Sequence, residues 1–146
     1  MRILAIDYGT VRTGIAVTDP EQIIATGLTT VPTTTIFDFL ANYMKKEKVE
    51  GIVVGEPKHL DNTPAQSAKA VEKFTEQLGI KFPGLPVYMV DERFTSRMAF
   101  QSMIDGGVSK KARRNKGTID MVSAALILQT FMEMKKDGRL PPSISG

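Results

Sequence analysis

The chain has 146 residues, 42% hydrophobic and 24% charged, which is typical of one globular domain with a single core. It contains no Cys, which excludes disulfides, thiolate catalysis and Cys-ligated zinc, and one His, His59, which argues against a His-rich metal site or a Ser-His-Asp triad. No apolar run reaches the ~20 residues of a membrane helix, and no secretory signal precedes the first apolar run. We therefore expect a cytoplasmic protein.

The N-terminal part of the chain predicts three antiparallel strands. The apolar run 3–6 ends at Asp7, and a polar turn between two glycines leads to a second β-prone run, 15–17. Residues 23–31 are rich in Ile, Leu, Thr and Val and predict a third strand. Asp7 is thus expected to point outward at the end of the first strand, although an Asp near Gly is also a common turn residue.

Helices and buried strands alternate in the middle of the chain. Apolar residues at helical spacing predict a helix over 36–44, with an N-cap from the threonines at 33–35. The apolar run 51–55 is typical of a buried parallel strand. Thr63-Pro64 opens a second predicted helix, which would stop at Gly79. Its buried face would consist of Ala68, Val71, Phe74 and Leu78.

The last third predicts a buried strand over 85–90, a short helix capped by Thr95 or Ser96, and a long helix opening at Gly117. The expected buried stripe of the long helix is Met121, Ala124, Ala125, Leu128 and Met132. Together the elements predict one α/β domain over 1–138, a mixed sheet with helices on both faces. Residues 139–146 are predicted to form a flexible tail.

The net charge of +3 is concentrated in one segment of the chain. Without the five positive side chains between residues 110 and 116 it becomes −2. A basic run of this kind suits phosphate binding, and the alternative is a solvated loop without a partner. The five residues are Lys110, Lys111, Arg113, Arg114 and Lys116.

Carboxylates stand at the ends of several predicted elements. Ligands of α/β sheets bind at the carboxyl ends of strands, so these acids would converge on one edge if their strands are parallel neighbours. Clustered carboxylates repel one another unless a cation such as Mg²⁺ or Mn²⁺ lies between them, and two such ions can support in-line phosphoryl displacement. Taken singly, each acid could be a turn residue, a salt-bridge partner or a helix-dipole residue. We favour Asp7, Glu92 and Asp120 as catalytic metal ligands, with Glu56 and Asp91 in reserve.

Four segments in order resemble one known family. These are DYGTVRTGIAV at 7–17, VGEP at 54–57, DERFTS at 91–96 and KGTIDMVSAALIL at 116–128. They resemble the YqgF family, also called RuvX, bacterial proteins of the RNase H-like superfamily. Its members are described as Holliday-junction resolvases and as nucleases that mature the 5′ end of pre-16S ribosomal RNA.

The resemblance implies an RNase H-like sheet of order 3-2-1-4-5 and metal-dependent phosphodiester hydrolysis with Asp7, Glu92 and Asp120 as the acids. The family usually has an apolar residue where this chain has Glu56, so the second metal ligand stays open between Glu56 and Glu92. The basic and hydroxyl side chains near the acids would bind the nucleic-acid backbone. They are Thr10, Arg12, Arg93, Arg97 and the five basic residues of 110–116.

The preferred substrate is pre-16S ribosomal RNA, alone or in a ribosomal precursor particle, and the second is a four-way DNA junction; both come from the resemblance. Cleavage of a junction would require a symmetric homodimer with two sites. One alternative is an ATP-binding fold of the sugar-kinase and actin type, but the chain has length for only one of its two lobes. Another is a non-catalytic nucleic-acid-binding module of ribosome assembly.

Overall fold

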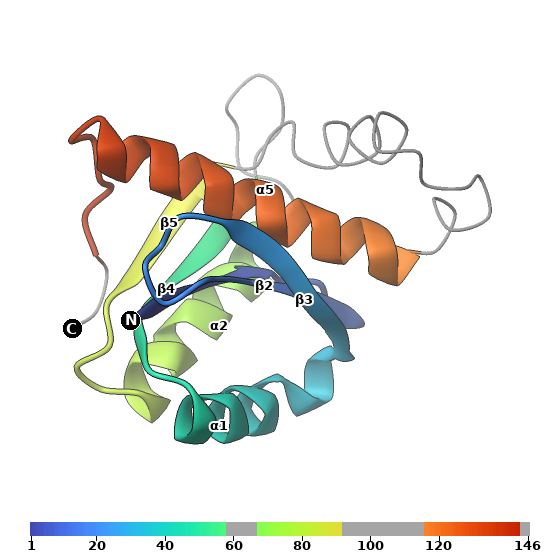
Figure 1. Ribbon diagram of the computed structural model, residues 1–146. Helices are drawn as coiled ribbons and strands as arrows, with labels where there is room; N and C mark the ends of the chain where they lie inside the picture. The colour runs from blue at the N-terminus through green and yellow to red at the C-terminus, as the bar shows by residue number, and fades with distance from the viewer. Residues whose placement is uncertain (58–66, 92–115, 144–146) are drawn as a thin grey trace.

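A five-stranded sheet with helices on both faces forms the body of the protein in the computed structural model, which describes residues 1–57, 67–91 and 116–143 (Figure 1). A single turn of 3₁₀ helix, Thr33–Thr35, precedes the first α-helix. The strands are β1 (Arg2–Asp7), β2 (Arg12–Thr18), β3 (Ala25–Pro32), β4 (Val49–Glu56) and β5 (Val87–Asp91), and the α-helices are α1 (Ile36–Lys46), α2 (Ala68–Lys81) and α5 (Lys116–Lys136).

The sheet has the order β3-β2-β1-β4-β5, as the family resemblance implied. β1, β2 and β3 form the predicted antiparallel meander, and β4 and β5 run parallel to β1. β3 begins at Ala25, two residues later than predicted. Asp19 explains the delay, because its Oδ1 accepts hydrogen bonds of 2.7 Å from the backbone N–H groups of Ile23 and Ile24 and holds both residues in the turn.

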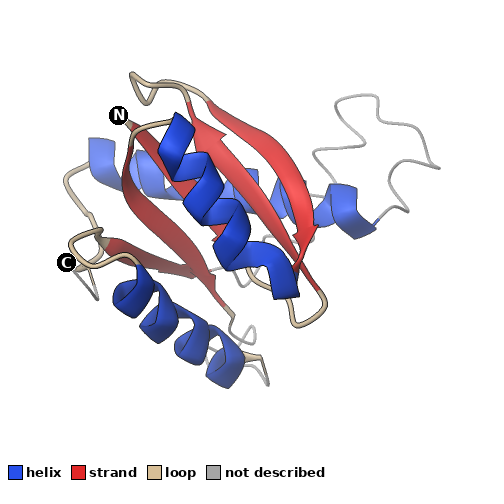
Figure 2. Ribbon diagram, turned by 90° about the horizontal axis from the view of Figure 1, so that it is seen from below, coloured by secondary structure: helices blue, strands red, loops and turns tan. Residues whose placement is uncertain are grey.

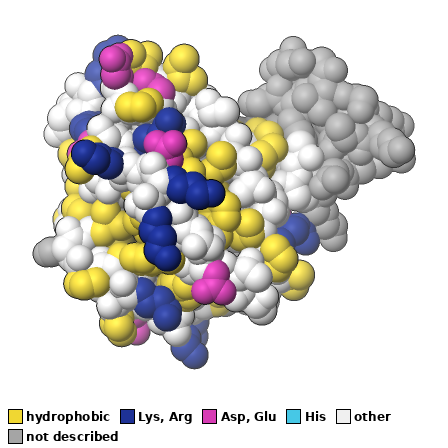
Figure 3. Space-filling view, turned by 60° about the horizontal axis from the view of Figure 1, so that its bottom comes forward, with side chains coloured by type: hydrophobic (Ala, Val, Ile, Leu, Met, Phe, Trp, Pro, Cys, Tyr) yellow, Lys and Arg dark blue, Asp and Glu magenta, His cyan; other side chains and the backbone are white. Residues whose placement is uncertain are grey.

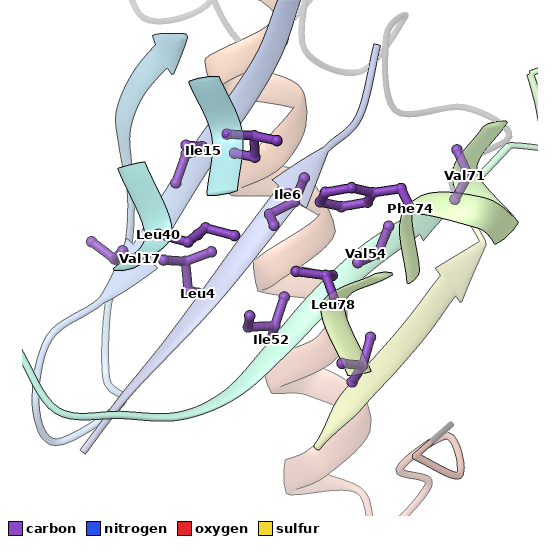
Figure 4. Close-up of a cluster of buried hydrophobic side chains, with 12 residues drawn as sticks. Leu4, Ile6, Ile15, Val17, Leu40, Ile52, Val54, Val71, Phe74 and Leu78 are labelled. Atoms are coloured by element: carbon purple, nitrogen blue, oxygen red, sulfur yellow. The ribbon is translucent and has the colours of Figure 1, made fainter. Parts of the chain in front are cut away.

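The two faces of the sheet have separate cores, because successive side chains of a strand point to opposite sides. Figure 2 shows α1 and α2 on one face and α5 on the other. On the first face, side chains of the strands point toward those of α1 and α2 (Figure 4). This core includes Leu4, Ile6, Ile15, Val17, Ile52, Val54, Leu40, Val71, Phe74 and Leu78. The core under α5 comprises Ile3, Ala5, Ala16, Val53, Val90, Ala124, Ile127, Leu128 and Phe131.

The helices depart from the predictions in three details. Thr35 occupies the N-cap position of α1, but its hydroxyl donates to the carbonyl of Pro32 instead of capping the helix. α2 continues past Gly79 to Lys81, because the buried Leu78 anchors its last turn, and the backbone N–H of Phe82 closes it on Leu78. The predicted start at Thr63 and the helix at Thr95 or Ser96 lie outside the described residues.

The third difference concerns the buried face of α5. Ile127 and Phe131 are fully buried there, whereas the predicted Met121, Ala125 and Met132 are only half-buried. Ala124 and Leu128 of the predicted stripe are fully buried as expected, so the prediction was wrong only in part. Apolar side chains occupy both flanks of this helix, so its sequence alone leaves the exact rotation about the axis undefined.

The surface over α1 and α2 carries Lys and Arg side chains interspersed with acidic, apolar and uncharged ones (Figure 3). Near the C-terminus, Ser143 forms an isolated antiparallel bridge with Tyr88 of β5. Across the ranges 1–57, 67–91 and 116–143, the structure has no helix both long and apolar enough to cross a membrane.

Candidate active site at the carboxyl end of β1

Asp7 is the last residue of β1, and its position in the strand fixes the face to which it belongs. Ile3 and Ala5 pack under α5, so strand alternation assigns Asp7 to the same face. In the antiparallel pairing with β2, Asp7 lies opposite Gly14. The first predicted acid therefore lies at the end of the sheet, on the side that α5 covers.

Gly14 is also a point where the backbone of α5 comes close to the sheet. A Cβ atom at this position would overlap the backbone carbonyl of Asp120 and would lie 2.9 Å from the backbone nitrogen of Met121. Only a residue without a side chain allows this approach. Gly14 thus adjoins Asp7 along the sheet and the backbone of Asp120 above it, so the fold brings the two acids to one region.

Asp120 lies one residue deeper in its helix than the predicted start at Gly117 implied, since α5 begins by Lys116. α5 already includes Lys116, and its first turn contains no acidic residue, so Asp120 is more than one turn inside the helix. Stabilisation of the helix dipole, the structural alternative for this residue, falls off beyond the first turn. This position therefore favours a role in the site over a role in the helix.

Two further contacts hold the start of α5 against β3. The Thr30 hydroxyl donates a hydrogen bond of 2.5 Å to the carbonyl of Gly117. At Gly27, a Cβ atom would lie 2.7 Å from Cγ of Met121, so a second strand glycine makes room for the helix. These contacts, with the one at Gly14, determine where the turn carrying Asp120 lies.

The loop between β1 and β2 is held by Thr33, in the 3₁₀ turn that precedes α1. Its hydroxyl donates to the carbonyl of Gly9 at 2.6 Å, and its backbone N–H donates to the carbonyl of Val11 at 3.0 Å. The hydroxyl of the buried Thr13 lies 2.8 Å from that of Thr33. The predicted phosphate-contacting residue Thr10 therefore lies on a braced loop, and Arg12 follows directly after it as the first residue of β2.

Tyr8, directly after Asp7, stacks on Phe74 of α2 with ring centroids 4.5 Å apart. This contact ties the chain after Asp7 to the opposite face of the sheet. Motif spacing did not reveal the roles of Thr33 and Tyr8, since both depend on segments distant in the sequence.

Arg12 forms an ion pair with Asp120, with 2.5 Å between Nε and Oδ2. Both atoms are buried, although the side chains are 38% and 21% exposed. Nε makes no aligned hydrogen bond, so the contact is one of charge. Both residues were predicted as site residues from the sequence, but their pairing was not, because it depends on the tertiary contact of α5 at Gly14, which lies on the same face of β2 as Arg12.

A cavity of about 220 Å³ opens beside this ion pair. It is lined by Gly9, Thr10, Val11, Arg12 and Asp120. A larger groove of about 670 Å³ between β3 and the start of α5 shares Val11 and Arg12 with the cavity. The cavity therefore joins the predicted phosphate-contacting side chains to one of the predicted acids.

Glu56 and Asp91 belong to the other face of the sheet. They lie opposite one another in the register of β4 and β5. Ile52 and Val54 of β4 and Val87 of β5 pack toward α1 and α2, and alternation gives both acids the same direction. The two reserve ligands are thus on the side of the sheet away from α5.

The described ranges contain no group of three or more His, Cys, Asp or Glu side chains arranged to hold a metal ion. Asp7 and Asp120 provide carboxylate oxygens, the ligands that Mg²⁺ and Mn²⁺ prefer, so their chemistry fits a hard divalent cation. A third predicted ligand, Glu92, lies outside the described residues. Six of the predicted basic residues also lie outside them, whereas a seventh, Lys116, is the first residue of α5. The six are Arg93, Arg97, Lys110, Lys111, Arg113 and Arg114.

Comparison with known proteins places the chain in a family. The family model RuvX, described as "Holliday junction resolvase", matches residues 1–134. Two relatives bear the name "Putative pre-16S rRNA nuclease". The one from Flavobacterium johnsoniae is 55% identical over 92% of this chain and 98% of its own, and the one from Christiangramia forsetii is 56% identical over 90% and 97%.

Among solved structures, Thermus thermophilus RuvC in complex with a Holliday junction substrate matches with a TM-score of 0.63 and 18% identity, over 97% of this chain and 99% of that one. This likeness concerns the fold, and it confirms the predicted RNase H-like architecture. The names of the relatives agree with the predicted nuclease class. The chain therefore belongs to the RuvX family.

Proposed function

We propose that this chain is a metal-dependent nuclease whose site lies where α5 meets the carboxyl end of β1. The observation that supports the proposal is that Gly14 adjoins both Asp7, its partner in the sheet, and the backbone of Asp120, so that acids from opposite ends of the sequence lie in one region. With Glu92, these acids would hold Mg²⁺ or Mn²⁺. When bound, the cation supplies charge stabilisation and activation of water for phosphodiester hydrolysis.

The residues around the cavity bind and orient the substrate in this proposal. The Thr10 hydroxyl, on the braced loop between β1 and β2, and the Arg12 guanidinium, at the start of β2, would contact the scissile phosphate. The predicted basic residues Arg93, Arg97 and those of 110–116 would attract the neighbouring phosphates without reading sequence.

The preferred substrate is pre-16S ribosomal RNA in the cytoplasm, free or within a precursor particle. The names of relatives more than 50% identical over nine-tenths of the chain support this choice. A four-way DNA junction is the second candidate, supported by the description of the family model. Symmetric cleavage of a junction would additionally require a homodimer.

The test compares the wild type with Asp7→Asn on labelled 5′-extended 16S precursor and on a labelled four-way junction, each with Mg²⁺ or Mn²⁺. Asn keeps the shape of the side chain and removes its charge, so we expect cleavage to fall by about 10²-fold or more. Asp137→Asn is the matched control, because Asp137 forms an exposed ion pair with Arg139 just beyond α5.

Cleavage of one substrate that the control retains and Asp7→Asn loses would support the proposal and identify the substrate. Salt-sensitive binding without cleavage of either substrate would overturn it in favour of a non-catalytic assembly module. Cleavage that Asp7→Asn retains in full would also contradict it, since the reaction would then not depend on this acid.

A further inference from the structure

In the ion pair between Arg12 and Asp120, a guanidinium contacts a carboxylate that is also a predicted metal ligand. The Nε atom of Arg12 lies 2.5 Å from Oδ2 of Asp120, and both atoms are buried at the edge of the cavity. If the carboxylate of Asp120 also held a divalent cation, the cation and the guanidinium of Arg12 would place two positive charges beside the same side chain. Two positive charges that contact the same carboxylate repel each other strongly, and the repulsion is greater where the site is partly desolvated.

The geometry of the pair allows exchange. Strong Arg–carboxylate pairs have aligned, often bidentate hydrogen bonds, whereas Nε of Arg12 makes none. The Arg12 side chain is 38% exposed, so it can turn away by rotation about its own bonds. Its backbone stays fixed, since Arg12 is paired with Pro32 in the sheet.

We propose that Arg12 and a divalent cation are alternative partners of Asp120, so that arrival of the cation releases the guanidinium for the substrate phosphate. This inference rests on the proposed function. It makes Arg12 a positioning residue of the metal site as well as a phosphate ligand. Cation and phosphodiester would then bind with positive cooperativity, because each favours the same position of Arg12.

The first test measures Mn²⁺ binding by electron paramagnetic resonance for the wild type, Arg12→Ala, Asp120→Asn and the double variant. We expect Arg12→Ala to lower the Kd for Mn²⁺ by about five- to tenfold, since the competing charge is gone. In the Asp120→Asn background the same change should alter Kd by less than about twofold, because coupling between contacting residues disappears when one partner is removed.

Arg2→Ala is the matched control for loss of a positive charge. Arg2 pairs with Glu47 at 3.3 Å, at the opposite end of β1 from Asp7. We expect this variant to bind Mn²⁺ with the affinity of the wild type. A second measurement follows a non-hydrolysable oligonucleotide by fluorescence anisotropy, where Mn²⁺ should tighten binding to the wild type at least fivefold more than binding to Arg12→Ala.

Unchanged or weaker Mn²⁺ binding by Arg12→Ala would overturn the inference. An equal gain in the Asp120→Asn background would also overturn it, because Arg12 would then act through the general field of the site. Absence of Mn²⁺ binding by the wild type itself is a different result, which would contradict the metal site of the proposed function and the inference with it.

Discussion

The two faces of the sheet are packed on different principles. Toward α1 and α2, branched and aromatic side chains fill the space, and the stacked rings of Tyr8 and Phe74 extend this core. Toward α5, Gly14 and Gly27 leave the backbone of the strands open to close approach by the helix. Both faces bury apolar side chains, but on the α5 face close backbone contacts also fix the position of a helix relative to two strands.

This difference separates stability from function within a small domain. Loss of a methyl group on the α1/α2 face should cost folding energy and leave the acids where they are. Addition of a methyl group at Gly14, where the backbone of α5 meets the strand, should move Asp120 relative to Asp7. Variants on each face can therefore confirm or contradict the division.

Leu78→Ala should have the largest effect on stability. Leu78 is fully buried in the core between α2 and the sheet. Truncation of a buried Leu lowers the free energy of unfolding by about 3–5 kcal/mol, and urea denaturation would measure it. Mn²⁺ affinity of the folded fraction should stay within about twofold of the wild type, and a tenfold loss would contradict the division between the faces.

Gly14→Ala should be the second in size and should affect both properties. Its new methyl group meets backbone atoms of Asp120 and Met121, which cannot rotate away, so we expect a loss of about 1–3 kcal/mol in the free energy of unfolding. Displacement of Asp120 should also weaken Mn²⁺ binding by at least about tenfold, measured on the folded protein.

Gly51→Ala is the matched control, a strand glycine whose new methyl group would lie 3.3 Å from the movable ring of Tyr88. It should change stability by less than about 1 kcal/mol and leave Mn²⁺ affinity unaltered. Equal losses of stability and of Mn²⁺ affinity in Gly14→Ala and Gly51→Ala would show that the contact of α5 at Gly14 does not itself position Asp120.

Thr33→Val should have a smaller effect. It removes the hydroxyl that donates to the carbonyl of Gly9 and accepts from Thr13, which should cost about 1 kcal/mol in thermal or urea unfolding. The loop carrying Thr10 would lose its brace, so oligonucleotide binding should weaken more than Mn²⁺ binding. The neighbouring, exposed Thr34→Val should change neither property; a similar loss there would trace the effect to helix propensity.

Asp19→Asn tests the far end of β2 and β3, where we expect the smallest effect. The N–H of Ile24, ahead of those of Ile23 and Glu21, lowers the pKa of Asp19 below 3.8, against a smaller opposing effect of desolvation. A lowered pKa in the folded state contributes stability that is present above pH 3.8 and is lost as pH falls through the folded-state pKa.

The wild type should therefore exceed Asp19→Asn in stability near neutral pH, and the difference should shrink as the pH falls below 3.8. Unfolding midpoints at several pH values would measure it. A difference that does not vary with pH would show that the hydrogen bonds matter and the charge does not.

Local sequence patterns were sufficient to predict most of the architecture. Apolar runs between turn residues predicted all five strands. Their order in the sheet came from the family resemblance. Boundaries shifted where a side chain intervened: the carboxylate of Asp19 delayed β3, and Leu78 carried α2 past Gly79.

By itself, the sequence determined that an acid ends β1, that another lies in the last long helix, and that glycine occupies position 14. Only the tertiary structure decided that these three belong together, because the contact of α5 with β2 joins segments more than a hundred residues apart. It also decided that Glu56 and Asp91 face the other way and that Arg12 reaches Asp120. Direction across a sheet and rotation of a helix depend on packing against distant residues, which no local pattern specifies.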